Sequence, residues 1–210
     1  MIEHVYRRTS DARSIARVIV ATDDRRIADA VRAFGGEVQM TSEAHPSGTD
    51  AEIVINVQGD EPLMDPRMID EAVAPFALDP ALEMSTLRKR IEAEADRHNP
   101  NITKVVVDED GFALYFSRAP IPFTRDGCPP APAWRHIGLY VYRRDTLLRL
   151  AALPPVAIER AEALEQLRAL AHGIAIQCVE TTRDAIGVDT PSDLEHVRAL
   201  VAAHPVVSAS

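Results

Sequence analysis

One stretch decides the fold that we expect: Glu52-Ile53-Val54-Ile55-Asn56-Val57-Gln58-Gly59-Asp60-Glu61-Pro62. Residues 53–57 are an apolar run rich in β-branched side chains, which fits a strand buried on both faces in the middle of a parallel sheet. Two carboxylates follow, and Pro62 prevents further pairing. Asp60 is therefore expected just beyond the carboxyl end of a central strand, where open α/β sheets bind ligands. Taken alone, an ordinary strand-to-loop exit with solvated acids is an equally good interpretation.

The bulk composition is that of a globular protein. The chain has 210 residues, 46% of them hydrophobic and 26% charged, which suits one large α/β domain or a domain with a small lobe. A formal net charge of −9 argues against binding nucleic acid through phosphate neutralisation. The two cysteines, Cys128 and Cys178, have no zinc or disulfide spacing, and Cys178 is expected to be a reduced core residue. Without a long apolar stretch or a signal-peptide pattern, we expect a cytoplasmic protein that does not contact a membrane.

Helical and strand periodicities alternate on both sides of this stretch. The strand–helix–strand pattern of residues 17–40 implies parallel strands with a right-handed crossover. The turn Asp108-Glu109-Asp110-Gly111 predicts a β-hairpin, so the sheet should be mixed. We therefore expect one α/β domain over residues 1–210, a mixed, mostly parallel sheet flanked by helices with a small antiparallel lobe. Helices are expected at residues 1–13, 25–34, 66–77, 145–152, 158–171 and 191–203, and strands at residues 17–24, 37–40, 53–57, 84–87, 102–107, 111–117, 136–142 and 174–179, with a Pro-rich loop at residues 123–134.

Two further polar segments are candidate binding sites. Ser47-Gly48-Thr49 offers hydroxyls and backbone amides that suit an anion or a nucleobase edge, although a plain polar turn is the more common meaning of such a fragment. Glu162 and Gln166 are spaced i, i+4 and should share a helix face, with Glu165 beside it. A solvated acidic face is the more common meaning of that spacing.

Asp189 precedes a helix start without being needed for it. Thr190 is expected to be the N-cap, Pro191 the first helical residue and Asp193 the capping-box acid. Asp60 and Asp189 each follow a strand at a Gly-containing turn, so neighbouring strands would bring both carboxylates to one ion. Mg²⁺ takes one or two protein carboxylates and completes its shell with phosphate oxygens and water, which suits phosphoryl transfer from a nucleotide.

Many motifs of the chain resemble those of the 3-deoxy-manno-octulosonate (Kdo) cytidylyltransferase, or CMP-Kdo synthetase, family. They occur in the family's order and cover nearly the whole chain. The matching segments are Val57 to Pro62, His45 to Asp50, Asn99-Pro100-Asn101 with Lys104-Val105-Val106, Leu114 to Arg118, His136 to Tyr140, Leu164 to Arg168, and Gly187 to Pro191.

The resemblance implies a Rossmann-like nucleotidyltransferase fold, usually dimeric, so a homodimer is expected. It implies that CTP and Kdo are joined to give CMP-Kdo and pyrophosphate, with Mg²⁺, for lipopolysaccharide biosynthesis. By the same resemblance Asp60 and Asp189 are the catalytic metal ligands. Arg118 is a candidate for the Kdo carboxylate, which Arg can grip bidentately. The resemblance places Ser47, Gly48 and Thr49 beside the cytidine, and Gln58, Arg118, His136, Tyr140, Glu165 and Gln166 around the sugar acid.

The chain departs from the family pattern in two places. The family opens with a strand and a basic phosphate-binding loop, whereas Met1 to Val5 corresponds to the helix after that loop. Asp50 joins Ala51 directly where the family has a helix, and a shorter gap lies before Trp134. Segments of a longer chain missing from this sequence would explain both, and we favour that because packed cores tolerate large deletions poorly. A truly shortened chain is the alternative, and an intact mass of 23.0 kDa would support it.

Other functions stay open at this point. A cytidylyltransferase for another sugar acid, such as sialic acid or an amino-substituted Kdo, would differ only in pocket residues. A truncated relative that binds nucleotide without turnover would fold but release no pyrophosphate. A plain Rossmann-like binding module is less consistent with the sequence, since no Gly-x-Gly-x-x-Gly fingerprint occurs.

Overall fold

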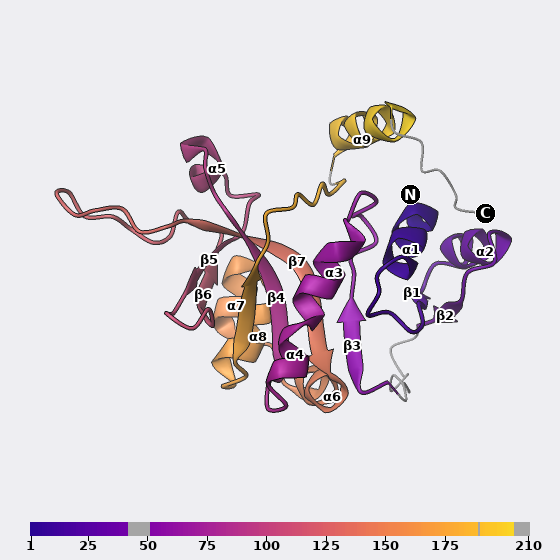
Figure 1. The fold of residues 1–210 in the computed structure, drawn as a ribbon, viewed down its shortest axis with the longest axis horizontal. Coiled ribbons are helices and arrows are strands. Elements are labelled where there is room, and N and C mark those ends of the chain that lie inside the picture. Colours follow the sequence, from indigo (N-terminus) through magenta and orange to yellow (C-terminus); the bar gives the residue numbers. More distant parts are fainter. Residues whose placement is uncertain (42–50, 189, 204–210) are drawn as a thin grey trace. The chain divides into compact units, whose positions relative to one another are not determined.

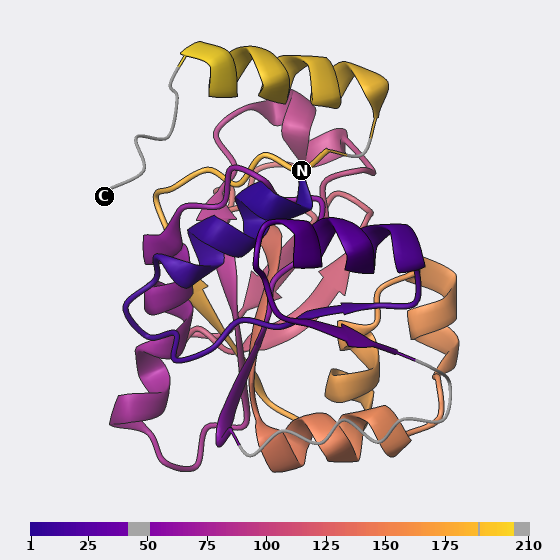
Figure 2. The same cartoon turned by 90° about the vertical axis from the view of Figure 1, so that its right-hand side faces the viewer.

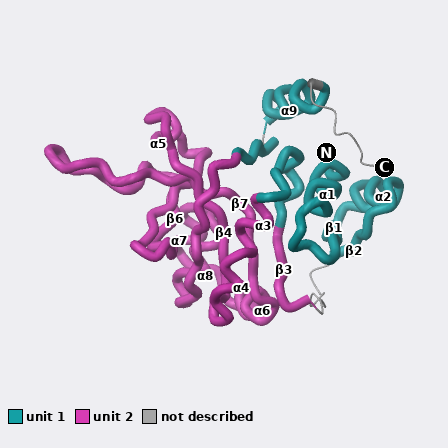
Figure 3. The backbone as a smooth tube through the Cα atoms, viewed as in Figure 1, with its two compact units in different colours: residues 1–46, 57–67, 184–210 teal, residues 47–56, 68–183 magenta. Residues whose placement is uncertain are grey.

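The computed structural model describes residues 1–41, 51–188 and 190–203. The chain divides into two compact units that alternate along the sequence: residues 1–46, 57–67 and 184–210 form unit 1, and residues 47–56 and 68–183 form unit 2 (Figure 3). Each unit is described by itself below, and the single domain over residues 1–210 stays a prediction. The segment with Ser47, Gly48 and Thr49 lies outside the described residues, as does Asp189.

Unit 1 contains the expected strand–helix–strand pattern. β1 (Val20–Thr22) and β2 (Val38–Met40) are parallel and are joined through α2 (Arg25–Ala33). The carboxylate of Asp24 accepts a hydrogen bond from the backbone N–H of Arg26 at 2.8 Å, which caps the start of α2. α1 (Ile2–Ser10) lies beside α2, with the rings of Tyr6 and Phe34 5.5 Å apart (Figure 2). This part of the fold is confirmed.

The helix α9 (Pro191–Ala203) also belongs to unit 1. The backbone N–H of Thr190 donates to Asp193 Oδ2 at 2.8 Å, and the backbone N–H of Asp193 donates to Thr190 Oγ1 at 3.2 Å. This is the reciprocal capping box that the sequence predicted. None of the helices in the described ranges combines the length and the hydropathy that a membrane span requires.

Unit 2 is built on a mixed sheet with the strand order β6-β5-β7-β4-β8, in which β3 also pairs with β7 (Figure 1). β4 and β8 run parallel, whereas the other neighbours in this sheet are antiparallel. The expected α/β fold with a mixed sheet and flanking helices is confirmed. The strands are β3 (Ile53–Asn56), β4 (Met84–Arg90), β5 (Lys104–Val107), β6 (Ala113–Ser117), β7 (Trp134–Arg143) and β8 (Ile176–Glu180), and the helices are α3 (Pro66–Val73, which begins in unit 1), α4 (Pro75–Leu78), α5 (Glu94–His98), α6 (Arg144–Ala152), α7 (Ala157–Glu162) and α8 (Gln166–Ala171).

Helices cover both faces of the unit 2 sheet. Met84 of β4 packs in a buried cluster with Phe116 of β6 and Leu167 of α8. The next residue, Ser85, points to the opposite face, because successive strand residues alternate. Its hydroxyl donates to the carbonyl of Ala72 in α3 at 2.6 Å. α8 therefore packs on one face and α3 on the other.

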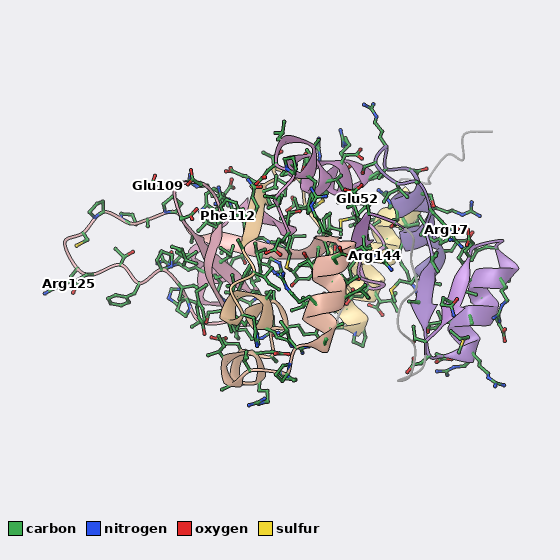
Figure 4. The ribbon with its side chains drawn as sticks, turned by 90° about the horizontal axis from the view of Figure 1, so that it is seen from below. Arg17, Glu52, Glu109, Phe112, Arg125 and Arg144 are labelled. Atoms are coloured by element: carbon green, nitrogen blue, oxygen red, sulfur yellow. The ribbon has the colours of Figure 1, made fainter. Side chains whose placement is uncertain are left out.

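The strand β3 differs from the expectation of a fully buried strand in a parallel sheet. It pairs antiparallel with β7, and its first three residues are half-buried. The register is held at its start by Glu52, whose carboxylate accepts from Arg143 Nη1 at 2.9 Å and whose carbonyl accepts from the N–H of Arg144 at 2.9 Å (Figure 4). An apolar β-branched run fits either pairing, so composition did not distinguish them.

Two predicted helices are interrupted. The helix expected at residues 66–77 is split into α3 and α4 at Pro75, which has no N–H to donate and whose ring clashes with the preceding turn. The helix expected at residues 158–171 ends at Ala163, which takes a left-handed conformation with φ of 53°. Glu162 and Gln166 therefore do not share one helix face, which corrects that prediction. The helix α5 was not predicted at all.

The hairpin formed by β5 and β6 is confirmed. Asp108 Oδ1 accepts from the backbone N–H of Asp110 at 3.0 Å and of Phe112 at 2.8 Å, and Gly111 takes a positive φ of 87°. After β6, the described residues 118–133 contain neither helix nor strand. They extend away from the unit 2 sheet, with Arg125 near the far end (Figure 4).

Candidate functional site

The turn after β3 belongs to unit 1 and carries Gln58 and Asp60. The N–H of Glu61 donates to the carbonyl of Gln58 at 3.3 Å, and the N–H of Met64 donates to the carbonyl of Glu61 at 3.2 Å. Pro62 and Met64 are buried, whereas Gln58 and Asp60 are half-buried. The buried residues anchor the turn, so the Asp60 carboxylate is displayed from a fixed backbone.

The segment that leads to Asp189 is hydrogen-bonded to this turn. The N–H of Val188 donates to the carbonyl of Asp60 at 2.9 Å. The sequence analysis let the two carboxylates meet if the strands before them were neighbours, but β3 pairs with β7 whereas β8 pairs with β4. The backbones of Asp60 and Val188 are nevertheless hydrogen-bonded. The position of Asp189 itself lies outside the described residues. Within residues 1–41, 51–188 and 190–203, no cluster of three or more His, Cys, Asp or Glu side chains could hold a metal ion.

The other predicted pocket residues belong to unit 2, where aromatic rings line up along β6 and β7. We call Phe116, His136, Tyr140 and Tyr142 the aromatic row. The centroids of Phe116 and His136 are 5.0 Å apart in a T-shaped contact, those of His136 and Tyr140 are 5.4 Å apart, and those of Tyr140 and Tyr142 are 6.0 Å apart and stacked.

Glu165 and Gln166 lie at the start of α8, close to the aromatic row. Burial raises the pKa of the Tyr140 phenol, and the nearby negative charge of Glu165 raises it further. Glu165 is exposed, whereas Gln166 is 5% exposed. The Gln166 Nε2 atom is buried without a hydrogen-bond partner among the described residues. A buried amide donor left unpaired is costly, so this nitrogen is suited to an acceptor on a ligand.

His136 is neutral in this environment. Burial lowers its pKa from 6.5 to about 3, because the charged imidazolium loses its hydration. Its Nε2 atom lies 2.9 Å from the hydroxyl oxygen of Thr86 on β4. His136 therefore can exchange hydrogen bonds with a ligand near neutral pH without carrying charge.

Arg118 makes four hydrogen bonds, two through its side chain and two through its backbone. Its Nε donates to the carbonyl of Glu162 at 3.0 Å and its Nη1 to the carbonyl of Pro100 at 3.2 Å. Its backbone N–H donates to Glu162 Oε2 at 2.9 Å, and its carbonyl accepts from Lys104 Nζ at 2.6 Å. The Nε–H and one N–H of Nη1 are therefore engaged, and within the described residues the Nη2 group of the guanidinium remains for a ligand.

Lys104 is fully buried in β5 and was not predicted as a functional residue. Besides the carbonyl of Arg118, its Nζ donates to the carbonyls of Asn99 at 2.8 Å and Ile102 at 2.6 Å. Burial and the nearby Arg118 charge lower its pKa. A lysine inside the apolar run of residues 102–107 was the signal that could have identified it, because Lys is almost never fully buried unless it is paired.

Comparison with known proteins gives consistent matches. The profile of the family described as Cytidylyltransferase matches residues 1–176. A 3-deoxy-manno-octulosonate cytidylyltransferase of Geobacter sulfurreducens is 54% identical, covering 94% of this chain and 87% of its own length. The protein of the same name from Syntrophotalea carbinolica is 54% identical, covering 95% of this chain and 87% of its own length. The protein of the same name from Solibacter usitatus is 50% identical, covering 95% of this chain and 83% of its own length.

Solved structures agree. A CMP:2-keto-3-deoxy-manno-octonic acid synthetase complexed with CTP matches with a TM-score of 0.88 and 44% identity, covering 96% of this chain and 87% of that chain. The 4-diphosphocytidyl-2C-methyl-D-erythritol synthase of Anaerococcus prevotii, with a TM-score of 0.58 and 13% identity over 96% of this chain and 85% of that chain, shares the fold. These matches confirm the resemblance that the motifs carried. The chain therefore belongs to the cytidylyltransferase family, together with these 3-deoxy-manno-octulosonate cytidylyltransferases.

Proposed function

We propose that this nucleotidyltransferase joins CTP and Kdo to give CMP-Kdo and pyrophosphate, for lipopolysaccharide biosynthesis. The observation that carries the proposal is the 54% identity, over 94% of the chain, with a curated 3-deoxy-manno-octulosonate cytidylyltransferase. The 44% identical synthetase was solved with CTP, which supports the choice of nucleotide. The neutral, partly buried polar groups along the aromatic row suit a sugar rich in hydroxyl groups.

Asp60 and Asp189 would hold a Mg²⁺ ion. Carboxylate oxygens are the donors that this ion prefers, and the hydrogen bond from Val188 to Asp60 supports a shared position of the two segments. When bound, the ion supplies positive charge to the triphosphate. Ser47, Gly48 and Thr49 would offer hydroxyls and backbone amides to the cytosine edge.

The sugar acid would be oriented by hydrogen bonds. The Nη2 group of Arg118 would bind its carboxylate, and Gln166 Nε2 would donate to one of its oxygens. The 2-hydroxyl oxygen then attacks the α-phosphorus in line, the bond to the bridging oxygen of the β-phosphate breaks, and pyrophosphate leaves with the electron pair. The hydroxyl proton passes to solvent. The other residues proposed to contact the sugar are Gln58, His136, Tyr140 and Glu165.

The cellular setting is part of the proposal. We place the reaction in the cytoplasm because it consumes CTP, and we propose a homodimer because the family that the motifs resemble is usually dimeric. No nucleic-acid or membrane partner is proposed.

The test is pyrophosphate release by the purified protein, after its intact mass has been compared with 23.0 kDa. We expect release to require CTP, Kdo and Mg²⁺ together, and to be slower when sialic acid or an amino-substituted Kdo replaces Kdo. Faster turnover of another sugar acid would reassign the substrate. A folded protein that binds CTP but releases no pyrophosphate would be a non-catalytic relative, and the proposal would fail.

A further inference from the structure

Thr86 lies inside the unit 2 sheet, where its hydroxyl meets three polar atoms. It is fully buried in β4. Its Oγ1 lies 2.9 Å from His136 Nε2, 2.8 Å from the carbonyl oxygen of Leu139 and 3.1 Å from the carbonyl oxygen of Ile137. All three of these partners come from one short segment of β7.

An irregularity in β7 explains why two carbonyls reach one hydroxyl. Opposite β4, Leu87 pairs with Ile137 whereas Thr86 pairs with Tyr140, so Gly138 and Leu139 are inserted between consecutive pairs. Such a bulge bends the strand and turns backbone groups out of the regular ladder. The carbonyls of Ile137 and Leu139 thereby face Thr86.

The number of protons available then determines which atom donates in each of these hydrogen bonds. A threonine hydroxyl has one proton to donate and lone pairs that accept, whereas a carbonyl oxygen only accepts. If the hydroxyl donated to His136, its oxygen would face two carbonyl oxygens at 2.8 Å and 3.1 Å with no proton between them. The hydroxyl must therefore donate to a backbone carbonyl, and His136 Nε2 must be the donor to Thr86.

The remaining nitrogen of His136 is then a bare acceptor. Burial keeps the imidazole neutral, and a neutral imidazole carries its one proton on Nε2 or on Nδ1 but not on both. The contacts with Phe116 and Tyr140 hold the ring in place. Within the part of the chain that the structure describes, the hydrogen bond of the His136 ring is the one between Nε2 and Thr86, which leaves Nδ1 available to a ligand.

We propose that Thr86 is a positioning residue that fixes His136 as its Nε2–H tautomer, so that Nδ1 accepts a hydrogen bond from a hydroxyl group of the sugar acid. The ligand named here rests on the proposed function, whereas the tautomer does not. His136 in this tautomer would favour a substrate with a hydroxyl donor at one position, because a sugar acid that is deoxy there would leave Nδ1 unpaired.

The first test reads the tautomer directly, by ¹⁵N NMR of the imidazole nitrogens in the full chain. The signals of His136 among the seven histidines are assigned by comparison with His136→Asn. We expect a protonated-type signal at Nε2 and a bare one at Nδ1 in the wild type and in Thr86→Ser, which keeps the hydroxyl. Thr86→Val should lose the preference. A proton on Nδ1 in the wild type would overturn the proposal, whether or not any variant folds.

The second test uses steady-state kinetics with CTP, Kdo and Mg²⁺. Thr86→Val should raise the KM for Kdo by about tenfold, the loss of one hydrogen bond, while the KM for CTP changes by less than about twofold. Thr86→Ser should restore the wild-type KM for Kdo. The matched control is Thr146→Val, which removes another buried threonine hydroxyl, on α6. An unchanged KM for Kdo in a folded Thr86→Val, or equal effects on both substrates, would refute the positioning role.

The two tests also separate this inference from the proposed function. If the wild type shows the Nε2–H tautomer but does not turn over Kdo, the assignment of Thr86 stands and the substrate assignment fails. If Kdo is turned over while Nδ1 carries the proton, the proposed function stands and the positioning role of Thr86 fails.

Discussion

Around the aromatic row, the neighbours of each polar side chain determine whether it donates or accepts hydrogen bonds and whether it is charged. Lys104 donates to three carbonyls, Glu162 accepts from Ser117 and from the backbone of Arg118, and His136 is neutral. In a weakly solvated interior each such bond is costly to leave unmade. Among the described residues around the row, Gln166 Nε2, His136 Nδ1 and the Nη2 group of Arg118 are suited to a ligand.

At the residue scale, Asp60→Ala should lower kcat by about a hundredfold or more while leaving the fold intact, since a metal ligand contributes mainly to the barrier. Asp60 is half-buried and its backbone, rather than its side chain, makes the bond to Val188. Pyrophosphate release and thermal unfolding would both be measured, with Asp110→Ala in the exposed hairpin turn as the control. Activity within about tenfold of the wild type would contradict a metal-binding role, because that is only about 1.4 kcal/mol of barrier.

His136 should make stability depend on pH. Its folded pKa of about 3 lies below the unfolded value of 6.5, so below pH 6.5 the unfolded state gains a proton that the folded state does not. The free energy of unfolding should therefore fall by about 1.4 kcal/mol between pH 7.5 and pH 5.5 from this residue alone. In urea titrations, His136→Asn should lose this part of the pH dependence, whereas His98→Asn on the exposed α5 should keep it. Equal pH dependence in wild type and His136→Asn would rule out the buried neutral state.

At the element scale, Lys104 ties β5 to the segments on either side of it. Lys104→Met keeps much of the volume but leaves the carbonyls of Asn99, Ile102 and Arg118 unpaired, which should lower the free energy of unfolding by about 2 kcal/mol or more. Because Arg118 loses its backbone anchor, the KM for Kdo should rise while the KM for CTP stays near the wild-type value.

The double variant makes the role of Lys104 testable. If Lys104 acts through Arg118, Lys104→Met should add little to the KM effect of Arg118→Ala, since coupled residues are not additive. Fully additive effects would mean that Lys104 acts on the sugar acid by another route. Arg90→Met, at the exposed end of β4, is the control for removing a cation from another strand of the same sheet.

At the scale of the whole molecule, the chain is expected to be a homodimer. Light scattering coupled to size exclusion should give twice the mass that mass spectrometry finds for one chain, at micromolar protein and at both low and moderate salt. A mass equal to one chain at all concentrations would contradict the dimer. A single-chain mass above 23.0 kDa would show that the purified protein contains more than these 210 residues.

Short-range chemistry was enough to predict much of this fold. Caps and turns depend on a few adjacent residues, so the Thr190–Asp193 capping box and the Asp108 hairpin turn could be predicted from the sequence. The helix interruption at Pro75 had a local signal, the proline itself, but the helical spacing of the apolar residues led us to predict one continuous helix. The left-handed turn at Ala163 had none, because a residue other than glycine rarely takes a positive φ and alanine gives no sign of it.

The tertiary structure decided which segments became neighbours. The antiparallel pairing of β3 with β7, the bulge that turns two carbonyls toward Thr86, and the carbonyls that surround Lys104 all join residues far apart in the chain. Residue types at a given spacing show that a group can donate or accept, but not which distant group it meets. The motifs therefore identified the family and most candidate pocket residues, whereas the tautomer of His136 and the anchoring of Arg118 follow from long-range strand pairing.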